Sequence, residues 1–142
     1  MPAYIALDDK VFSSEGIISA AVEVAHSHGV ALPKLLSGTG IFAQDLLDPD
    51  HRFNASQIKR LLNQYLKLMK QPDAGFLLGH QLILELGNLG QSLLSSPTLS
   101  DALRLLHRFH KQVCPLLHIR FFCNKQRCHL FVSPVFGAEE PL

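Results

Sequence analysis

The sequence has little concentrated charge. Its 142 residues include 13 Lys and Arg against 12 Asp and Glu, for a formal net charge of +1, and the basic residues form no long run. Domains that bind nucleic acid usually concentrate basic charge on one face. The composition therefore argues against this chain binding DNA by itself.

Long apolar runs are also missing. No stretch of about 18 uncharged apolar residues exists, which argues against a transmembrane helix. Residues 1–15 contain Asp8, Asp9 and Glu15 and no apolar core of the kind found in signal peptides. We therefore expect a cytoplasmic protein with no membrane partner, whose three cysteines are reduced thiols.

No sequence motif of an enzyme is present. The Gly-x-Ser-x-Gly turn of hydrolases is absent, as is the Gly-Lys-Ser/Thr phosphate loop. The segment Gly38-Thr39-Gly40 lacks the third glycine and the preceding strand of a dinucleotide-binding fingerprint. We expect no enzymatic activity and no cofactor.

The apolar residues, 47% of the chain, recur mostly at helical spacing. A first helix begins near Ile17 and stops at Gly29, which is a typical helix-ending residue. Asn54 and Gln57 have the spacing of a capping box and start a long helix that ends before Pro72. Other residues predict further starts and breaks: Pro33, Asp73, Gly87, Gly90, and Thr98 with Asp101.

After Pro115 the apolar residues no longer recur at helical spacing but at every second position. Two alternating runs flank a short polar turn at residues 124–127, which predicts a β-hairpin over about residues 116–133. The fold class is therefore α+β, with a mainly helical part of five or six helices followed by a C-terminal hairpin. The predicted cross-strand pairs are Cys123 with Cys128, Phe121 with Leu130, and Ile119 with Val132.

Three histidine and cysteine residues share one predicted helix face. His107, His110 and Cys114 could converge on a metal ion. Because no second ligand pair of recognisable spacing exists, ordinary hydrogen-bonding histidines are favoured and no metal is expected. Cys123 and Cys128 could form a redox-active disulfide or act as two small apolar side chains, and a reducing compartment favours the second.

Residues 20–41 superficially suggest a helix-turn-helix. A recognition helix must present polar or basic side chains to base edges. The second helix of this segment offers only Lys34 among apolar neighbours. We therefore expect it to pack in the core.

Three segments, in this order and spacing, resemble the N-terminal arabinose-binding-like domain of AraC/XylS-type bacterial transcription regulators. The resemblance covers roughly residues 16–133. The third segment is the most specific, because it joins a Gly-rich turn to a Ser-Pro turn and a Leu-rich helix. The segments are residues 35–50, residues 73–79, and residues 87–106.

The resemblance implies an effector-sensing and dimerising module. Residues 16–142 would form this regulatory domain, in incomplete form, after a lead-in at residues 1–15. In the family a C-terminal pair of helix-turn-helix motifs binds promoter DNA, and we expect that half to be absent from this chain. The implied partners are a small-molecule effector and a second copy of the chain. The alternatives are a protein-interaction module without a ligand and a small His/Cys metal or redox protein.

An effector pocket is expected between the helix at residues 99–112 and the hairpin, because titratable residues there stand beside aromatic ones. Arginines suit a carboxylate effector, histidines could hydrogen-bond it, and phenylalanines could form the walls. The competing interpretation is a solvated arginine face with ordinary surface histidines. The expected contacts are Arg104, His107, Phe109, His110, Arg120 and Phe122.

Overall fold

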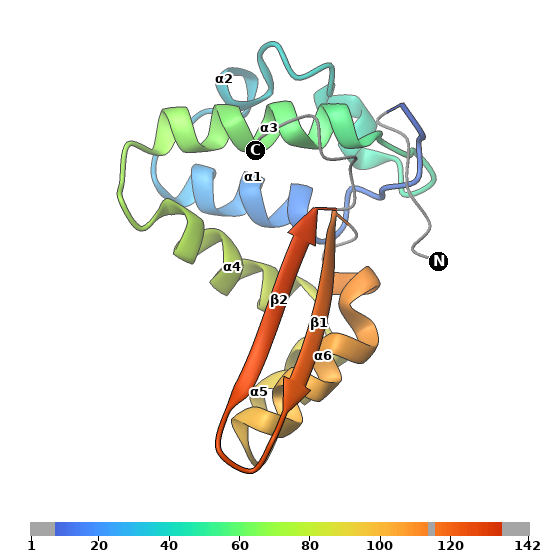
Figure 1. The fold of residues 1–142 in the computed structure, drawn as a ribbon. Helices are drawn as coiled ribbons and strands as arrows, with labels where there is room; N and C mark the ends of the chain where they lie inside the picture. The colour runs from blue at the N-terminus through green and yellow to red at the C-terminus, as the bar shows by residue number, and fades with distance from the viewer. Residues whose placement is uncertain (1–7, 114–115, 135–142) are drawn as a thin grey trace. The chain divides into compact units, whose positions relative to one another are not determined.

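A computed structural model of the chain describes residues 8–113 and 116–134. These residues form two compact units that divide between Glu85 and Leu86 (Figure 1). The first contains four α-helices and a 3-10 helix, and the second contains two α-helices and an antiparallel hairpin. The described residues thus confirm the α+β class and the order of helices before hairpin.

The first unit is built around two helices that each bury one side. Figure 1 shows α1 with α3 on one side and α4 on the other, and these pairs are in contact. The short helix α2 packs on α1 and α3. The elements are α1 (Ile17–Ser27), α2 (Leu32–Leu36), η1 (Ala43–Leu47), α3 (Ala55–Met69) and α4 (Ala74–Glu85).

The core of this unit follows from helical periodicity. Ile58, Leu61 and Tyr65 lie three or four residues apart on α3 and are fully buried, because residues at that spacing share one helix face. Ile18 and Ala21 of α1 are buried in the same way. Full burial of a large apolar side chain contributes about 1.5–3 kcal/mol, so each large side chain of this stripe stabilises the unit.

The start of α3 is the predicted capping box. The Gln57 N–H donates to Asn54 Oδ1 at 2.8 Å, and the Asn54 N–H donates to Gln57 Oε1 at 2.9 Å. Gln57 Nε2 also donates to the carbonyl of Gly40 at 3.0 Å. One side chain therefore caps the helix and fastens the preceding turn to it.

The segment that suggested a helix-turn-helix packs into the core. Leu35 and Leu36 of α2 are buried, whereas Lys34 is exposed. Gln64 Nε2 of α3 donates to the Lys34 carbonyl at 3.1 Å. These contacts agree with a packing role for α2.

In the second unit two helices accompany the hairpin. Figure 1 shows α5 and α6 on one side of the strands, and α6 contacts both α5 and β1. The predicted start of α6 is confirmed, because Thr98 Oγ1 accepts the Asp101 N–H at 3.1 Å. The elements are α5 (Asn88–Leu94), α6 (Leu99–Val113), β1 (Leu117–Cys123) and β2 (Cys128–Pro134).

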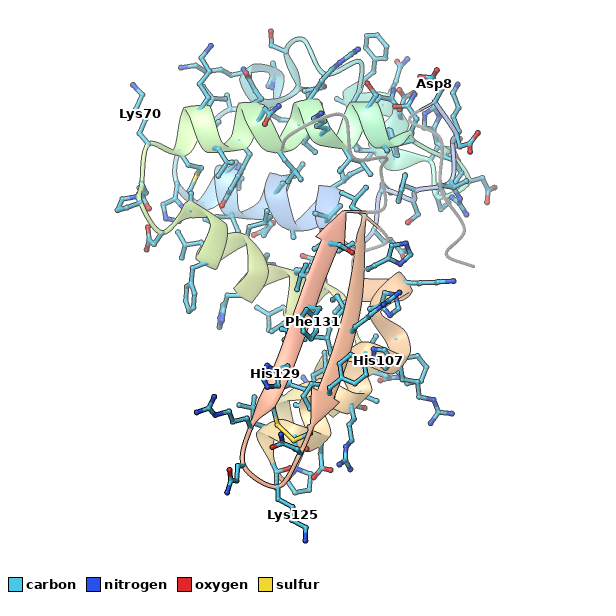
Figure 2. The ribbon with its side chains drawn as sticks, in the orientation of Figure 1. Asp8, Lys70, His107, Lys125, His129 and Phe131 are labelled. Atoms are coloured by element: carbon cyan, nitrogen blue, oxygen red, sulfur yellow. A yellow bond between two sulfur atoms is a disulfide. The ribbon has the colours of Figure 1, made fainter. Side chains whose placement is uncertain are left out.

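Two expectations for this unit are wrong. Gly90 does not break the chain but lies buried within α5, and Gly87, with a φ of 57°, is the break. A helix tolerates one glycine at a cost of about 1 kcal/mol. Cys123 and Cys128 are joined by a disulfide (Figure 2), so they are not two reduced thiols. Their direct pairing across the hairpin brings the sulfur atoms together.

Candidate functional site

The hairpin has the predicted register, and this register determines which side chains share a face. Ile119 pairs with Val132, Phe121 with Leu130, and Cys123 with Cys128. Because successive strand residues alternate between faces, the intervening pairs lie on the opposite face. Those intervening pairs are His118 with Ser133, Arg120 with Phe131, and Phe122 with His129.

This opposite face contains a hollow of about 400 Å³ lined by Arg120, Phe122, Phe131 and Ser133. We call it the hairpin hollow. Phe122 and Phe131 are 60% and 56% exposed. Two neighbouring aromatic side chains are thus exposed beside an arginine, and contiguous exposed apolar surface is a common feature of interaction sites.

The aromatic walls have a defined geometry. The rings of Phe122 and Phe131 meet edge to face, with their centroids 6.0 Å apart and their planes at 74°. The His129 ring stacks on Phe131 at 6.3 Å (Figure 2 labels both). Arg120 supplies a permanent positive charge and Ser133 a hydroxyl. The hairpin hollow therefore suits a small molecule with an anionic group and a flat apolar part.

The histidines of α6 lie together beside β1 and are engaged in hydrogen bonds. His107 Nδ1 lies 2.8 Å from the Ile119 carbonyl, and His110 Nδ1 lies 2.7 Å from the His107 carbonyl. Since a carbonyl oxygen only accepts, each Nδ1 is the protonated donor. The His118 ring lies 6.3 Å from that of His110. Its Nε2 is buried and has no hydrogen-bond partner among the described residues.

The six expected contact residues thus fall into separate groups. Arg120 and Phe122 meet in the hairpin hollow, and His107 and His110 meet beside β1. Phe109 lies where α6 departs from helical geometry, and the Arg108 guanidinium covers its ring at 5.5 Å. Arg104 is exposed on α6.

Sequence reasoning missed two residues of the hairpin hollow, Phe131 and Ser133. The information was available, because the register predicted from Cys123 and Cys128 also places Phe131 opposite Arg120. The sequence did not show which face of the hairpin is exposed. An alternating pattern separates the two faces of a two-stranded sheet but does not tell which face other elements cover.

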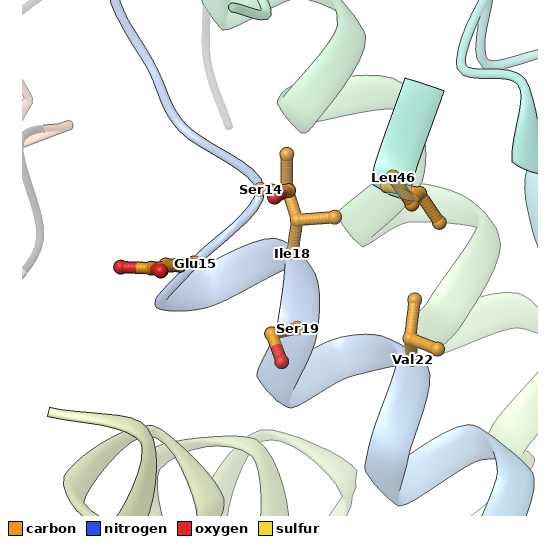
Figure 3. A pocket seen from close by; sticks show the side chains of 6 residues that line it. All are labelled: Ser14, Glu15, Ile18, Ser19, Val22 and Leu46. Atoms are coloured by element: carbon orange, nitrogen blue, oxygen red, sulfur yellow. The ribbon is translucent and has the colours of Figure 1, made fainter. Parts of the chain in front are cut away.

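A second, smaller hollow lies in the first unit, between the start of α1 and η1 (Figure 3). Its volume is about 160 Å³. The Ser19 hydroxyl donates a hydrogen bond to Glu85 Oε2 at 3.0 Å. The lining residues are Ser14, Glu15, Ile18, Ser19, Val22 and Leu46. No sequence motif indicated this hollow, which is too small for most effectors.

Neither a metal cluster nor a membrane helix is found in the described part of the chain. Residues 8–113 and 116–134 contain no group of three or more His, Cys, Asp and Glu side chains that could hold a metal ion. Cys114, the third member of the suggested triad, lies outside the described residues. No helix within the same ranges is long and apolar enough to cross a bilayer.

The comparison with protein families identifies the domain. Residues 29–138 match the family model of the N-terminal arabinose-binding domain of AraC transcription regulators. The chain belongs to this family. The match covers most of the chain and confirms the resemblance found in the sequence. No curated protein and no solved structure matches the chain.

Membership in the AraC arabinose-binding family gives the hairpin hollow its context. Membership in this family indicates that the chain is a regulatory domain that senses a small-molecule ligand. The matched range includes all of α6, β1 and β2, and therefore the whole hairpin hollow.

Proposed function

We propose that residues 16–142 form the sensing domain of a bacterial, cytoplasmic AraC-type regulator whose effector binds at the hairpin hollow. The observation that carries this proposal is the hollow itself, in which Arg120 stands beside the exposed edge-to-face pair Phe122 and Phe131. The effector would be a small carboxylate with an apolar or aromatic part, because arginine binds carboxylates with two parallel hydrogen bonds.

In this proposal the helix α6 is coupled to the effector site through β1, since the described side chains that line the hairpin hollow all belong to the hairpin. Arg104, His107, Phe109 and His110 belong to the helix that packs on β1. His107 is bonded to the backbone of β1 at Ile119. A ligand that moves the hairpin would therefore also move this helix.

The domain acts as a regulator and not as an enzyme in this proposal. Binding shifts a conformational equilibrium by the difference in ligand affinity between two states. The output is promoter binding by a separate helix-turn-helix domain of the regulator, which works as a homodimer. The sensing chain has a near-neutral net charge of +1, which agrees with DNA binding by another domain.

Thermal unfolding of the 142-residue chain tests ligand binding. The probes are small aromatic and aliphatic carboxylates, together with arabinose, the sugar in the family's name. A ligand at a hundred times its Kd should stabilise the fold by about 2.7 kcal/mol. Arg120→Ala should weaken carboxylate binding by about tenfold or more, because a charge-assisted hydrogen bond is lost.

The matched control is Arg127→Ala, which removes an exposed arginine from the turn of the same hairpin. It should leave the Kd unchanged. Equal Kd values for Arg120→Ala and the parent would contradict the assignment to the hairpin hollow. If His110→Ala also binds like the parent, α6 has no part in the site.

A second candidate function is a protein-interaction module without a small ligand. The exposed aromatic side chains of the hairpin, Phe122 and Phe131, favour it. No rise in melting temperature with any probe, together with an intact fold, would support this alternative over ligand sensing.

A further inference from the structure

The hairpin hollow has an apolar end and a polar end. Successive cross-strand pairs on this face stand about 7 Å apart, because two residues of an antiparallel strand span that length. Phe122 belongs to one pair, Arg120 and Phe131 form the next, and Ser133 belongs to the third. The lining therefore changes along the strands from an aromatic ring to a cation and then to a hydroxyl.

The register brings Arg120 and Ser133 within reach of one ligand. Phe122 and Phe131 are diagonal neighbours across the two strands, and their ring centroids are 6.0 Å apart. Arg120 and Ser133 have the same diagonal relation, one pair further along the hairpin. A long side chain can reach across such a diagonal. The cation and the hydroxyl therefore approach the hollow from different strands.

The polar groups of Arg120 and Ser133 are available to a ligand. Within the described ranges neither side chain makes a hydrogen bond or an ion pair. From Leu117 to Pro134 the sequence has no Asp or Glu, so the hairpin itself supplies no counter-ion for Arg120. The hollow thus offers one side chain for an anion and one for a neutral polar group.

We propose that the effector of the hairpin hollow is an α-hydroxy acid with an aromatic substituent. Its carboxylate binds Arg120, its hydroxyl hydrogen-bonds to Ser133, and its aromatic ring contacts Phe122 and Phe131. In such an acid one tetrahedral carbon carries all three groups and points them in different directions, as the three parts of the lining require. This assignment rests on the proposed effector site and narrows the carboxylates that the site accepts.

The size and handedness of the hollow make the assignment specific. Its volume of about 400 Å³ lies near the lower end of the range for small-molecule sites, which agrees with a ligand of one ring. Three different contacts to one carbon also distinguish mirror images, because exchanging two substituents moves the hydroxyl away from Ser133. The site should therefore prefer one enantiomer.

Mandelate and phenylacetate test the hydroxyl, because these two carboxylates differ only by the hydroxyl on the carbon next to the carboxylate. Isothermal titration calorimetry of the 142-residue chain measures the Kd of each compound. The better enantiomer of mandelate should bind about three- to tenfold more tightly than phenylacetate, because one neutral hydrogen bond is gained. The other enantiomer should bind no more tightly than phenylacetate.

Ser133→Ala removes the hydroxyl and should make the Kd values of mandelate and phenylacetate equal. The Kd of phenylacetate itself should stay unchanged, because this compound has no group that bonds to Ser133. Ser133→Thr keeps a hydroxyl on a side chain that suits a strand and should retain the preference for mandelate. The matched control is Gln126→Ala, which removes an exposed polar side chain from the turn of the same hairpin. It should bind both compounds like the parent, and circular dichroism verifies that all variants fold.

The outcomes distinguish the α-hydroxy acid from the proposed function. A preference for mandelate that disappears in Ser133→Ala and persists in Ser133→Thr supports it. Equal binding of both compounds by the parent, or a preference that survives Ser133→Ala, overturns it, and the effect of Arg120→Ala then still judges the carboxylate site. A parent that binds neither compound also overturns it, whereas the thermal-shift experiment with other carboxylates judges ligand sensing separately.

Discussion

At the scale of single residues, Tyr65 links two helices of the first unit. Its side chain is fully buried, and its hydroxyl donates to the Ala74 carbonyl at 2.7 Å. Burial raises the pKa of the Tyr65 hydroxyl above its ordinary value, and the nearby Asp73 carboxylate raises it further. Tyr65 thus fastens the first turn of α4 to α3.

Tyr65→Phe should lower the free energy of unfolding by about 1–3 kcal/mol, because the buried Ala74 carbonyl loses its donor. Urea denaturation at neutral pH measures this. In the unfolded chain the hydroxyl ionises near pH 10, whereas the folded state keeps it protonated to higher pH. Its contribution is therefore complete below pH 10 and is lost as the pH rises through the raised pKa. A Tyr65→Phe variant whose stability declines above pH 10 as steeply as the parent's would contradict this.

Lys70 ends α3 with a strained backbone. Its φ and ψ are 52° and 20°, in the left-handed region, which costs a non-glycine residue about 1–2 kcal/mol. Lys70→Gly should therefore raise the free energy of unfolding by up to about 1 kcal/mol. Lys70→Ala keeps the strain and is the control. A glycine variant no more stable than the alanine variant would show that the strain is compensated elsewhere.

At the scale of elements, the capping box of α3 depends on one side chain. Asn54→Ala should cost about 1 kcal/mol of stability, because Asn54 Oδ1 accepts the Gln57 N–H. Asn63→Ala, an exposed change within the same helix, is the control and should be neutral or slightly stabilising. Chemical denaturation of both variants measures the difference. Equal effects would mean that the cap contributes little.

The disulfide should stabilise the hairpin. It closes a loop with a sequence separation of 5, for which chain entropy gives about 2 kcal/mol. Treatment with a dithiol reductant should therefore speed amide hydrogen exchange in β1 and β2. The double variant Cys123→Ser/Cys128→Ser should already exchange fast and should not respond to the reductant. Unchanged exchange in the reduced parent would contradict a stabilising role.

At the scale of the whole molecule, buried side chains are unevenly divided between the two units. α3 buries Ile58, Leu61 and Tyr65 completely, whereas no side chain described in α6 is buried. Since local stability follows burial, amides of α1 and α3 should exchange more slowly than those of α5 and α6. Native-state hydrogen exchange followed by mass spectrometry measures this. Uniform protection across both units would show that they unfold together.

The local features of the fold could be predicted from the sequence. The capping box at Asn54, the start of α6 at Thr98 and the hairpin register through Cys123 and Cys128 are all present as expected. Each depends on residues close in the chain, whose hydrogen bonds and alternation act over a few positions. Gly90 was mispredicted because a glycine ends a helix only where the backbone needs a positive φ.

The candidate site was only partly predictable. The sequence placed arginine, histidine and phenylalanine near the hairpin, but the tertiary structure decided that Arg120 and Phe122 share a hollow with Phe131. It also decided that His107 bonds to the backbone of β1.

By itself the sequence determined the family, the helices and the strand register, because these follow from local pattern. Only the tertiary structure decided which hairpin face is exposed among the described residues, because exposure depends on which distant segments pack together.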